Sequence, residues 1–230
     1  MRAMTLVAVA ASAFSLVAPV SVADDRDEES RALFRYEVIV TNVTRGQQFT
    51  PLLLVTHRPS LRLFALGRPA SPELATLAEE GDIGPLRTAL QSRPQVTQIR
   101  GGSGLTNPGS AQRFVIDARP FVDRLSLAAM LIPTNDAFVA LNAIDLPESS
   151  REIVIFAIAY DAGSERNDEL CSSIPGPFFA ECGGPGGGAR VGEGEGFVHV
   201  HNGIHGVGSL TPAARDWRNP VAQVKIRRIR

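Results

Sequence analysis

Hydrophobic and polar residues alternate along several short segments of the chain, which is the pattern of β-strands with one buried face. The first segment is FRYEVIVTNVT at residues 34–44, and PLLLVTH at 51–57 follows after a connection framed by Gly46 and Pro51. We expect the second strand to lie beside the first in a sheet. Further strands are predicted at residues 96–100, 113–118 and 125–132.

REIVIFAIAY at residues 151–160 is the most apolar strand candidate after the N-terminal apolar run. Its nearly continuous hydrophobicity predicts a central strand that is covered on both faces. The C-terminal segment at 216–230 predicts a last strand, with apolar positions at Val221, Val224 and Ile226 and with arginines facing solvent.

Signals for two short helices interrupt the strands. Ser71 is typical of a helix N-cap, Pro72 of the first helical position, and Gly81 of the residue that ends a helix. DIGPLRTALQS at residues 82–92 predicts a second helix with its leucines on one face. Several short strands with one helical insertion predict a mainly β protein, an antiparallel β-sandwich with a short helical insertion.

The N-terminal sequence predicts export. Arg2 precedes an uncharged apolar run that ends in small residues, so residues 1–23 are interpreted as a secretory signal peptide cleaved after Ala23. Residues 24–32 are charged and lack apolar periodicity, which predicts a disordered acidic leader before a single domain at 33–230. Since no second long apolar run follows, we expect no integral membrane segment after cleavage and a secreted, periplasmic or cell-surface location.

Composition and missing motifs exclude some classes of function. The formal net charge is −1, from 23 basic and 24 acidic residues, which gives no reason to expect a nucleic-acid partner. The glycine-rich segment at 183–196 lacks the lysine of a phosphate-binding loop and predicts a flexible connector. The chain has no Gly-x-Ser-x-Gly motif, and we expect that the protein is not an enzyme.

Cys171 and Cys182 are the only cysteines in the chain. In an exported protein, an isolated pair so close in sequence predicts a disulfide bond. The bond would close a short loop and contribute about 2–3 kcal/mol to stability. Binding of a metal by the two thiols is the alternative, but the chain has no Cys-x-x-Cys pair to support it.

Acidic residues lie on both sides of the central strand candidate. Asp136 precedes it, and Asp161 and Glu165 follow it, separated from each other by a turn that contains a glycine. Hard cations such as calcium bind six to eight oxygens, which loops at one end of a sandwich can supply from carboxylates and carbonyls. The same residue types also form ordinary solvated turns, so the pattern alone leaves both interpretations open.

Five segments together resemble a known family. They are TNVTRGQQFTPLLLVTH at 41–57, LFALGRPASPELATLAEEG at 63–81, PTNDAFVALN at 133–142, YDAGSERNDELC at 160–171 and GFVHVHNGIHG at 196–206. From about Tyr36 to Val224, the chain resembles bacterial proteins with the spondin N-terminal domain, the fold of the amino-terminal region of F-spondin. The resemblance implies an extracellular β-sandwich, similar to calcium-dependent membrane-binding domains, that binds calcium and serves in adhesion.

The resemblance also implies which residues bind calcium. It places one aspartate ligand at Asp136 and another at Asp161, and the third family aspartate corresponds to Glu165, which is longer by one methylene. We therefore expect an exported calcium-binding module with a binding or adhesion role at or outside the cell surface. Its expected partner is an extracellular protein or glycan, which the sequence does not identify.

The segment FVHVHNGIHG holds three of the four histidines of the chain. If it forms a strand, His199 and His201 point to one face, and His205 can fold back beside them after the turn at Asn202 and Gly203. Three imidazoles would suit zinc or copper. The alternative function is therefore a histidine-dependent metalloprotein, either a metal-sequestering protein or a small hydrolase. The plain interpretation is a polar strand face followed by a glycine turn.

Overall fold

An antiparallel sheet of ten strands organises the part of the chain that this computed structural model describes, residues 32–188 and 192–230. Along the sheet the order is β4-β3-β6-β7-β8-β12-β1-β5, with β2 paired to β6 and β11 paired to β8. These strands are β1 Phe34–Asn42, β2 Gln48–Phe49, β3 Leu53–His57, β4 Val96–Gly101, β5 Ala111–Ala118, β6 Arg124–Ile132, β7 Ala137–Asp145, β8 Ile153–Asp161, β11 His199–Val200 and β12 Ala222–Arg228.

Smaller elements complete the described residues. The helices are α2 Pro72–Glu80, α3 Gly84–Gln91 and α4 Pro212–Arg215, and a short hairpin joins β9 Phe178–Phe179 to β10 Gly184–Pro185 around the 3-10 turn Ala180–Cys182. No helix among the described residues combines the length and the apolar character that crossing a membrane requires.

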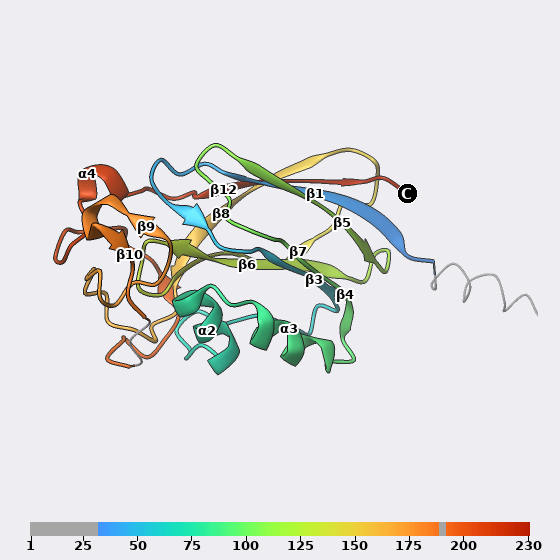
Figure 1. The fold of residues 1–230 in the computed structure, drawn as a ribbon. Coiled ribbons are helices and arrows are strands. Elements are labelled where there is room, and N and C mark those ends of the chain that lie inside the picture. Colours follow the sequence, from blue (N-terminus) through green and yellow to red (C-terminus); the bar gives the residue numbers. More distant parts are fainter. Residues whose placement is uncertain (1–31, 189–191) are drawn as a thin grey trace, which may run out of the picture. The chain divides into compact units, whose positions relative to one another are not determined.

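The sheet folds over on itself into two facing layers, one containing β1, β5 and β12 and the other containing β3 and β6 (Figure 1). Its two end strands, β4 and β5, come together through side chains. The backbone N–H of Asp117 donates to Oε1 of Gln98 at 2.6 Å, and Nε2 of Gln98 donates to Oδ2 of Asp117 at 3.3 Å. The predicted mainly β, antiparallel sandwich with a short helical insertion is confirmed.

Two apolar clusters stabilise this arrangement. The larger cluster fills the space between the two layers and includes Val38, Leu127 and Val224. Helices α2 and α3 lie along the outer face of the layer that contains β3 and β6 (Figure 1). The smaller cluster lies between them and this layer, and in it Leu74 and Leu77 of α2 pack with Phe138. The helical insertion therefore covers one layer of the sandwich and leaves the other layer facing solvent.

The predicted central position of β8 in the sheet is confirmed, but the predicted coverage of both its faces is wrong. The sequence predicts that β8 is covered on both faces, but Val154 and Phe156 on its outer face are 47% and 56% exposed. The strands covered on both faces are β3, in which all residues are buried, and β6, in which every residue from Leu125 to Ile132 is buried. The sequences of β6 and β8 are similarly hydrophobic. Whether the outer face of a strand is covered depends on which layer α2 and α3 pack against.

The predicted pairing of the first two strands is also wrong. β1 lies between β5 and β12, with Val38 opposite Ile226 on one side and Phe114 on the other. β3 lies between β4 and β6 in the other layer. The alternation of apolar residues determines which face of a strand is buried, but it does not determine the neighbouring strand.

The helix boundaries agree with the predicted caps. Oγ of Ser71 accepts a hydrogen bond from the backbone N–H of Leu74 at 3.3 Å, and Pro72 begins α2. Gly81 ends the helix with φ 71°, in the left-handed region, and its N–H donates to the carbonyl of Leu77 at 3.0 Å. These are local interactions, and short sequence patterns specify them well.

The predicted disulfide bond between Cys171 and Cys182 is confirmed. Residues Ala32–Arg230 group into one compact unit. The predicted signal peptide at 1–23, and the predicted leader at 24–32 except its last residue, lie outside the described residues.

Candidate metal centre

The two aspartates of the predicted calcium site meet at one end of the sheet. Asp136 directly precedes β7, and Asp161 is the last residue of β8. Since β7 and β8 are antiparallel with Ala137 opposite Asp161, the two carboxylates become neighbours although 25 positions separate them in the sequence. The carbonyl of Asp136 also accepts a hydrogen bond from the N–H of Ala162 at 3.2 Å.

Asp136 is fully buried and only half satisfied. Its Oδ2 accepts hydrogen bonds from the backbone N–H groups of Ser164 and Glu165, at 2.8 and 3.1 Å. Its Oδ1 is buried and has no hydrogen-bond partner among the described residues. Burial and, after it, the nearby charge of Asp161 raise the pKa of Asp136 to about 7. A buried carboxylate oxygen without a partner is costly, so this oxygen is a candidate ligand for a cation.

Asp161 is held firmly by the loop that follows it. Its Oδ1 accepts a hydrogen bond from the N–H of Gly163 at 2.7 Å, and its Oδ2 accepts one from Nδ2 of Asn167 at 2.8 Å. Burial raises the pKa of Asp161, although these hydrogen bonds act in the opposite direction. Each oxygen keeps a second lone pair for a cation.

Glu165, the third residue of the predicted calcium set, is fully buried beside Asp136. The three predicted ligands thus lie in one loop region. Their ligand atoms, however, do not all lie within 4.8 Å of one another, and the only three residues of the described part that meet this criterion are Asp161, Glu195 and His199.

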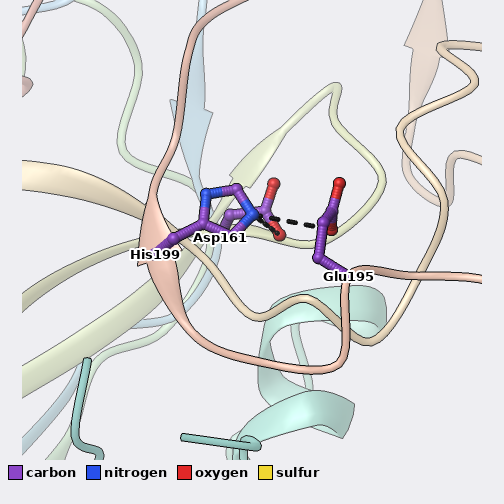
Figure 2. Close-up of side chains that lie close together, drawn as sticks. All are labelled: Asp161, Glu195 and His199. Atoms are coloured by element: carbon purple, nitrogen blue, oxygen red, sulfur yellow. Dashed lines mark ion pairs between the residues drawn. The ribbon is translucent and has the colours of Figure 1, made fainter. Parts of the chain in front are cut away.

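Figure 2 shows the imidazole of His199 turned toward both carboxylates of this cluster. Nε2 of His199 lies 3.5 Å from Oδ1 of Asp161 and 3.5 Å from Oε2 of Glu195. His199 reaches Asp161 because it lies directly opposite this residue in the antiparallel pairing of β11 with β8. Partial burial lowers the pKa of His199, but the carbonyl of Val200 and the two carboxylates outweigh it, so the pKa is raised.

Glu195 joins the cluster because the glycine-rich segment packs against the loop after β8. The N–H of Gly196 donates to the carbonyl of Gly163 at 2.8 Å, and a Cβ atom on Gly163 would lie 2.3 Å from the carbonyl oxygen of Phe197. The segment was predicted only as a flexible connector, and the structure shows in addition that its part at 192–196 packs against the site. Sequence reasoning missed Glu195, although its position four residues before His199 was a usable signal.

His201 approaches the same carboxylate from inside the protein. Its Nε2 lies 3.7 Å from Oδ2 of Asp161, and its Nδ1 accepts a hydrogen bond from the N–H of Gly203 at 2.9 Å. Nδ1 therefore carries no hydrogen, and the neutral ring has its proton on Nε2. Burial lowers the pKa of His201 to about 3. The ring of His201 also lies 5.0 Å from that of Trp217.

His205 lies apart from this cluster. Its side chain is exposed, and its backbone N–H donates to Oε1 of Glu169 at 2.6 Å. The three histidines do not form a group of ligand atoms within 4.8 Å in the described part of the chain. The structure thus brings His199 and His201 together at Asp161, but it does not bring His205 to them.

The fold and this site define a class of protein: an antiparallel β-sandwich with buried carboxylates in the loops at one end. The model of the spondin N-terminal domain family (Spondin_N) matches residues 40–172, more than half of the chain, so the chain belongs to this family. In the comparison with curated proteins, nothing matches. The family match covers Asp136, Asp161 and Glu165 and ends before Glu195 and His199.

Membership in this family indicates an extracellular type of module. The intramolecular disulfide bond is consistent with an exported protein, because such bonds persist in oxidising compartments.

Proposed function

We propose that this protein is an exported, non-enzymatic module that binds calcium through Asp136, Asp161 and Glu165 and uses the surrounding loops to bind a partner. The partner is an extracellular protein or glycan, and the role is binding or adhesion at or outside the cell surface. Membership in the spondin N-terminal domain family supports this proposal at the level of the module.

One observation carries the calcium proposal: Oδ1 of Asp136 is buried without a hydrogen-bond partner among the described residues, next to a second buried carboxylate at Asp161. Two buried negative charges repel each other, and their burial is unfavourable unless a cation or a proton compensates them. The available donor atoms are carboxylate oxygens, which calcium prefers.

Calcium would supply positive charge to the start of β7 and the loop after β8. The N–H groups of Ser164 and Glu165 already attach this loop to Asp136. A cation that binds both aspartates would stabilise the same attachment, so calcium would order the loops that present a binding surface.

Thermal unfolding of the metal-free protein with and without calcium tests the proposal. Calcium at a hundredfold excess over its Kd would stabilise the folded state by about 2.7 kcal/mol. For a domain of this size, we expect the Tm to rise by roughly 5–10 °C. The variants Asp136→Asn and Asp161→Ala should remove the rise, and Asp136→Asn keeps an oxygen that can accept the existing hydrogen bonds.

Asp145→Asn is the matched control, because Asp145 is the last residue of β7, the strand that Asp136 directly precedes, and its side chain is 83% exposed. This variant should keep the full calcium response. An unchanged melting curve of the wild-type protein at millimolar calcium would contradict the proposal.

A further inference from the structure

We propose that Asp161, Glu195 and His199 form a second metal site, specific for a transition-metal ion of the zinc class. This site differs in residues and in ligand chemistry from the calcium site proposed above. Only Asp161 belongs to both, so the second site stands whether or not calcium binds.

The two distances from Nε2 of His199 fit a zinc ion, and all three ligand atoms lie within 4.8 Å of one another. In a tetrahedral site with bonds of about 2.0–2.1 Å, neighbouring ligand atoms lie about 3.3 Å apart. Nε2 of His199 lies 3.5 Å from an oxygen of Asp161 and 3.5 Å from an oxygen of Glu195. Small movements of the side chains would therefore be enough to bind the ion.

The proton of His199 is placed as it is in histidines that bind metals. Nδ1 lies 3.1 Å from the carbonyl oxygen of Val200, and a carbonyl only accepts hydrogen bonds, so Nδ1 carries the hydrogen. In the neutral ring, Nε2 then directs its lone pair toward the two carboxylates. Metal-bound histidines commonly donate their other N–H to a carbonyl in this way.

Nε2 of His199 is shielded from solvent and has no hydrogen-bond partner among the described residues. A lone pair that faces two carboxylate oxygens is unfavourable unless a metal ion or a proton lies between them. Either a metal ion or a proton on Nε2 would make this arrangement favourable, and zinc titration together with NMR distinguishes the two.

His201 provides a second, independent observation at this site. It is almost fully buried, and its Nε2 faces Oδ2 of Asp161 without a hydrogen-bond partner of its own in the described structure. Because Nδ1 of His201 accepts the N–H of Gly203, the N–H at Nε2 points toward Asp161. This arrangement orients the carboxylate so that Oδ1 faces His199.

The ligand set favours zinc over calcium. One imidazole nitrogen and two carboxylates suit borderline first-row ions, whereas calcium prefers oxygen ligands only. The side chains of His199 and Glu195 are 24% and 41% exposed. A fourth position of the ion would thus be open to water or to a ligand from outside the protein.

Zinc titration of the full chain, purified without a His-tag and stripped of metal with a chelator, tests the site. We expect one zinc ion per chain by isothermal titration calorimetry, and cobalt(II) in its place should give the visible absorption of a tetrahedral site. His199→Gln and Glu195→Gln should each weaken zinc binding at least tenfold.

Two matched controls accompany these variants. Glu193→Gln changes another exposed carboxylate of the same glycine-rich segment, and His205→Gln changes an exposed histidine nearby. Both should bind zinc as the wild type does. Unchanged zinc binding in His199→Gln, or no stoichiometric zinc in the wild type with His199 protonated by NMR, would overturn the proposal.

The calcium site and the zinc site can be tested independently of each other. Asp136→Asn should abolish the calcium response and leave zinc binding intact, since Asp136 is not a ligand of the second site. Zinc binding without a calcium response would refute only the calcium module, and a calcium response without zinc binding would refute only the second site.

Discussion

His201 lies against Asp161 with its Nε2 3.7 Å from Oδ2 of the carboxylate, while its Nδ1 accepts the N–H of Gly203. Both nitrogens of the ring are therefore directed at protein groups. A neutral imidazole with its proton on Nε2 has no lone pair there for a metal ion. Within the histidine segment, His199 can therefore bind a metal ion through Nε2, whereas His201 cannot and instead contacts Asp161.

The first prediction concerns this contact. His201→Phe preserves a ring that can pack on Trp217, but it leaves the N–H of Gly203 without its acceptor. We expect a loss of about 1–3 kcal/mol in the free energy of unfolding, because a buried donor would be unsatisfied. Urea unfolding measures this loss, and His205→Phe, at an exposed position, should change stability by less than about 0.5 kcal/mol.

The second prediction tests the glycine that allows the site to form. Gly163 has φ 66°, and an added Cβ would lie 2.3 Å from the carbonyl oxygen of Phe197. Gly104 has a similar φ of 68° but has no atom within 4 Å of such a Cβ. Gly104→Ala should cost about 1–2 kcal/mol from backbone strain alone.

Gly163→Ala should cost clearly more than its control, because the backbone of the loop or of Phe197 has to move. It should also weaken any metal binding at Asp161. Equal losses in the two variants, measured by urea unfolding, would show that the close approach to Phe197 is unimportant.

The third prediction is a dependence of stability on pH. His57 is fully buried, with Nε2 2.8 Å from Oγ of Ser126 and Nδ1 2.8 Å from the carbonyl oxygen of Arg58. Burial lowers the pKa of His57 below its ordinary value of 6.5. As the pH falls below 6.5, the unfolded chain takes up a proton at this residue but the folded chain does not, so stability decreases.

His57→Gln should therefore show a smaller decrease in Tm between pH 6.5 and 5 than the wild type does. His205→Gln serves as the control and should follow the wild-type curve. Parallel curves for the wild type and His57→Gln would contradict the assignment of this pH dependence to His57.

The fourth prediction concerns the disulfide bond. Replacement of both Cys171 and Cys182 by serine should lower the free energy of unfolding by about 2–3 kcal/mol, since the unfolded chain gains the freedom of the short loop. Chemical denaturation of the double variant measures the loss. A stability equal to that of the wild type would show that the bond contributes nothing under those conditions.

The fifth prediction tests which strand is covered on both faces. Leu127→Ala in β6 should cost about 2–5 kcal/mol, because it leaves a cavity in a fully buried position. Phe156→Ser in β8 should cost less than about 1 kcal/mol, because more than half of this side chain is exposed. The reverse order of the two losses would contradict the conclusion that β6, and not β8, is covered on both faces.

The sequence alone predicted the local features of this protein. Alternation located β1, β3 and β12, and the signals at Ser71 and Gly81 predicted the start and end of α2. The disulfide bond between Cys171 and Cys182 was predictable because the chain has no other cysteine. Each of these features depends on residues that are close in sequence or unique in the chain.

The candidate site was predicted only in part. The family resemblance directed attention to Asp136 and Asp161, and the structure places both carboxylates at one end of the sheet. Glu195 was missed because a glutamate in a glycine-rich segment has the composition of a solvent-exposed connector. Its partner Asp161 lies 34 positions earlier, and no local pattern links the two.

The sequence by itself thus determined most of the long strands, though not β7, and also the caps of α2, the disulfide bond and the fold class, because short-range periodicity and backbone preferences act within a few residues. Only the tertiary structure decided that β1 pairs with β5 and β12, that the helices cover β6 rather than β8, and that Glu195 and His199 meet at Asp161. These outcomes depend on packing between segments far apart in the chain, where many pairings bury similar apolar area and only the complete set of contacts selects one.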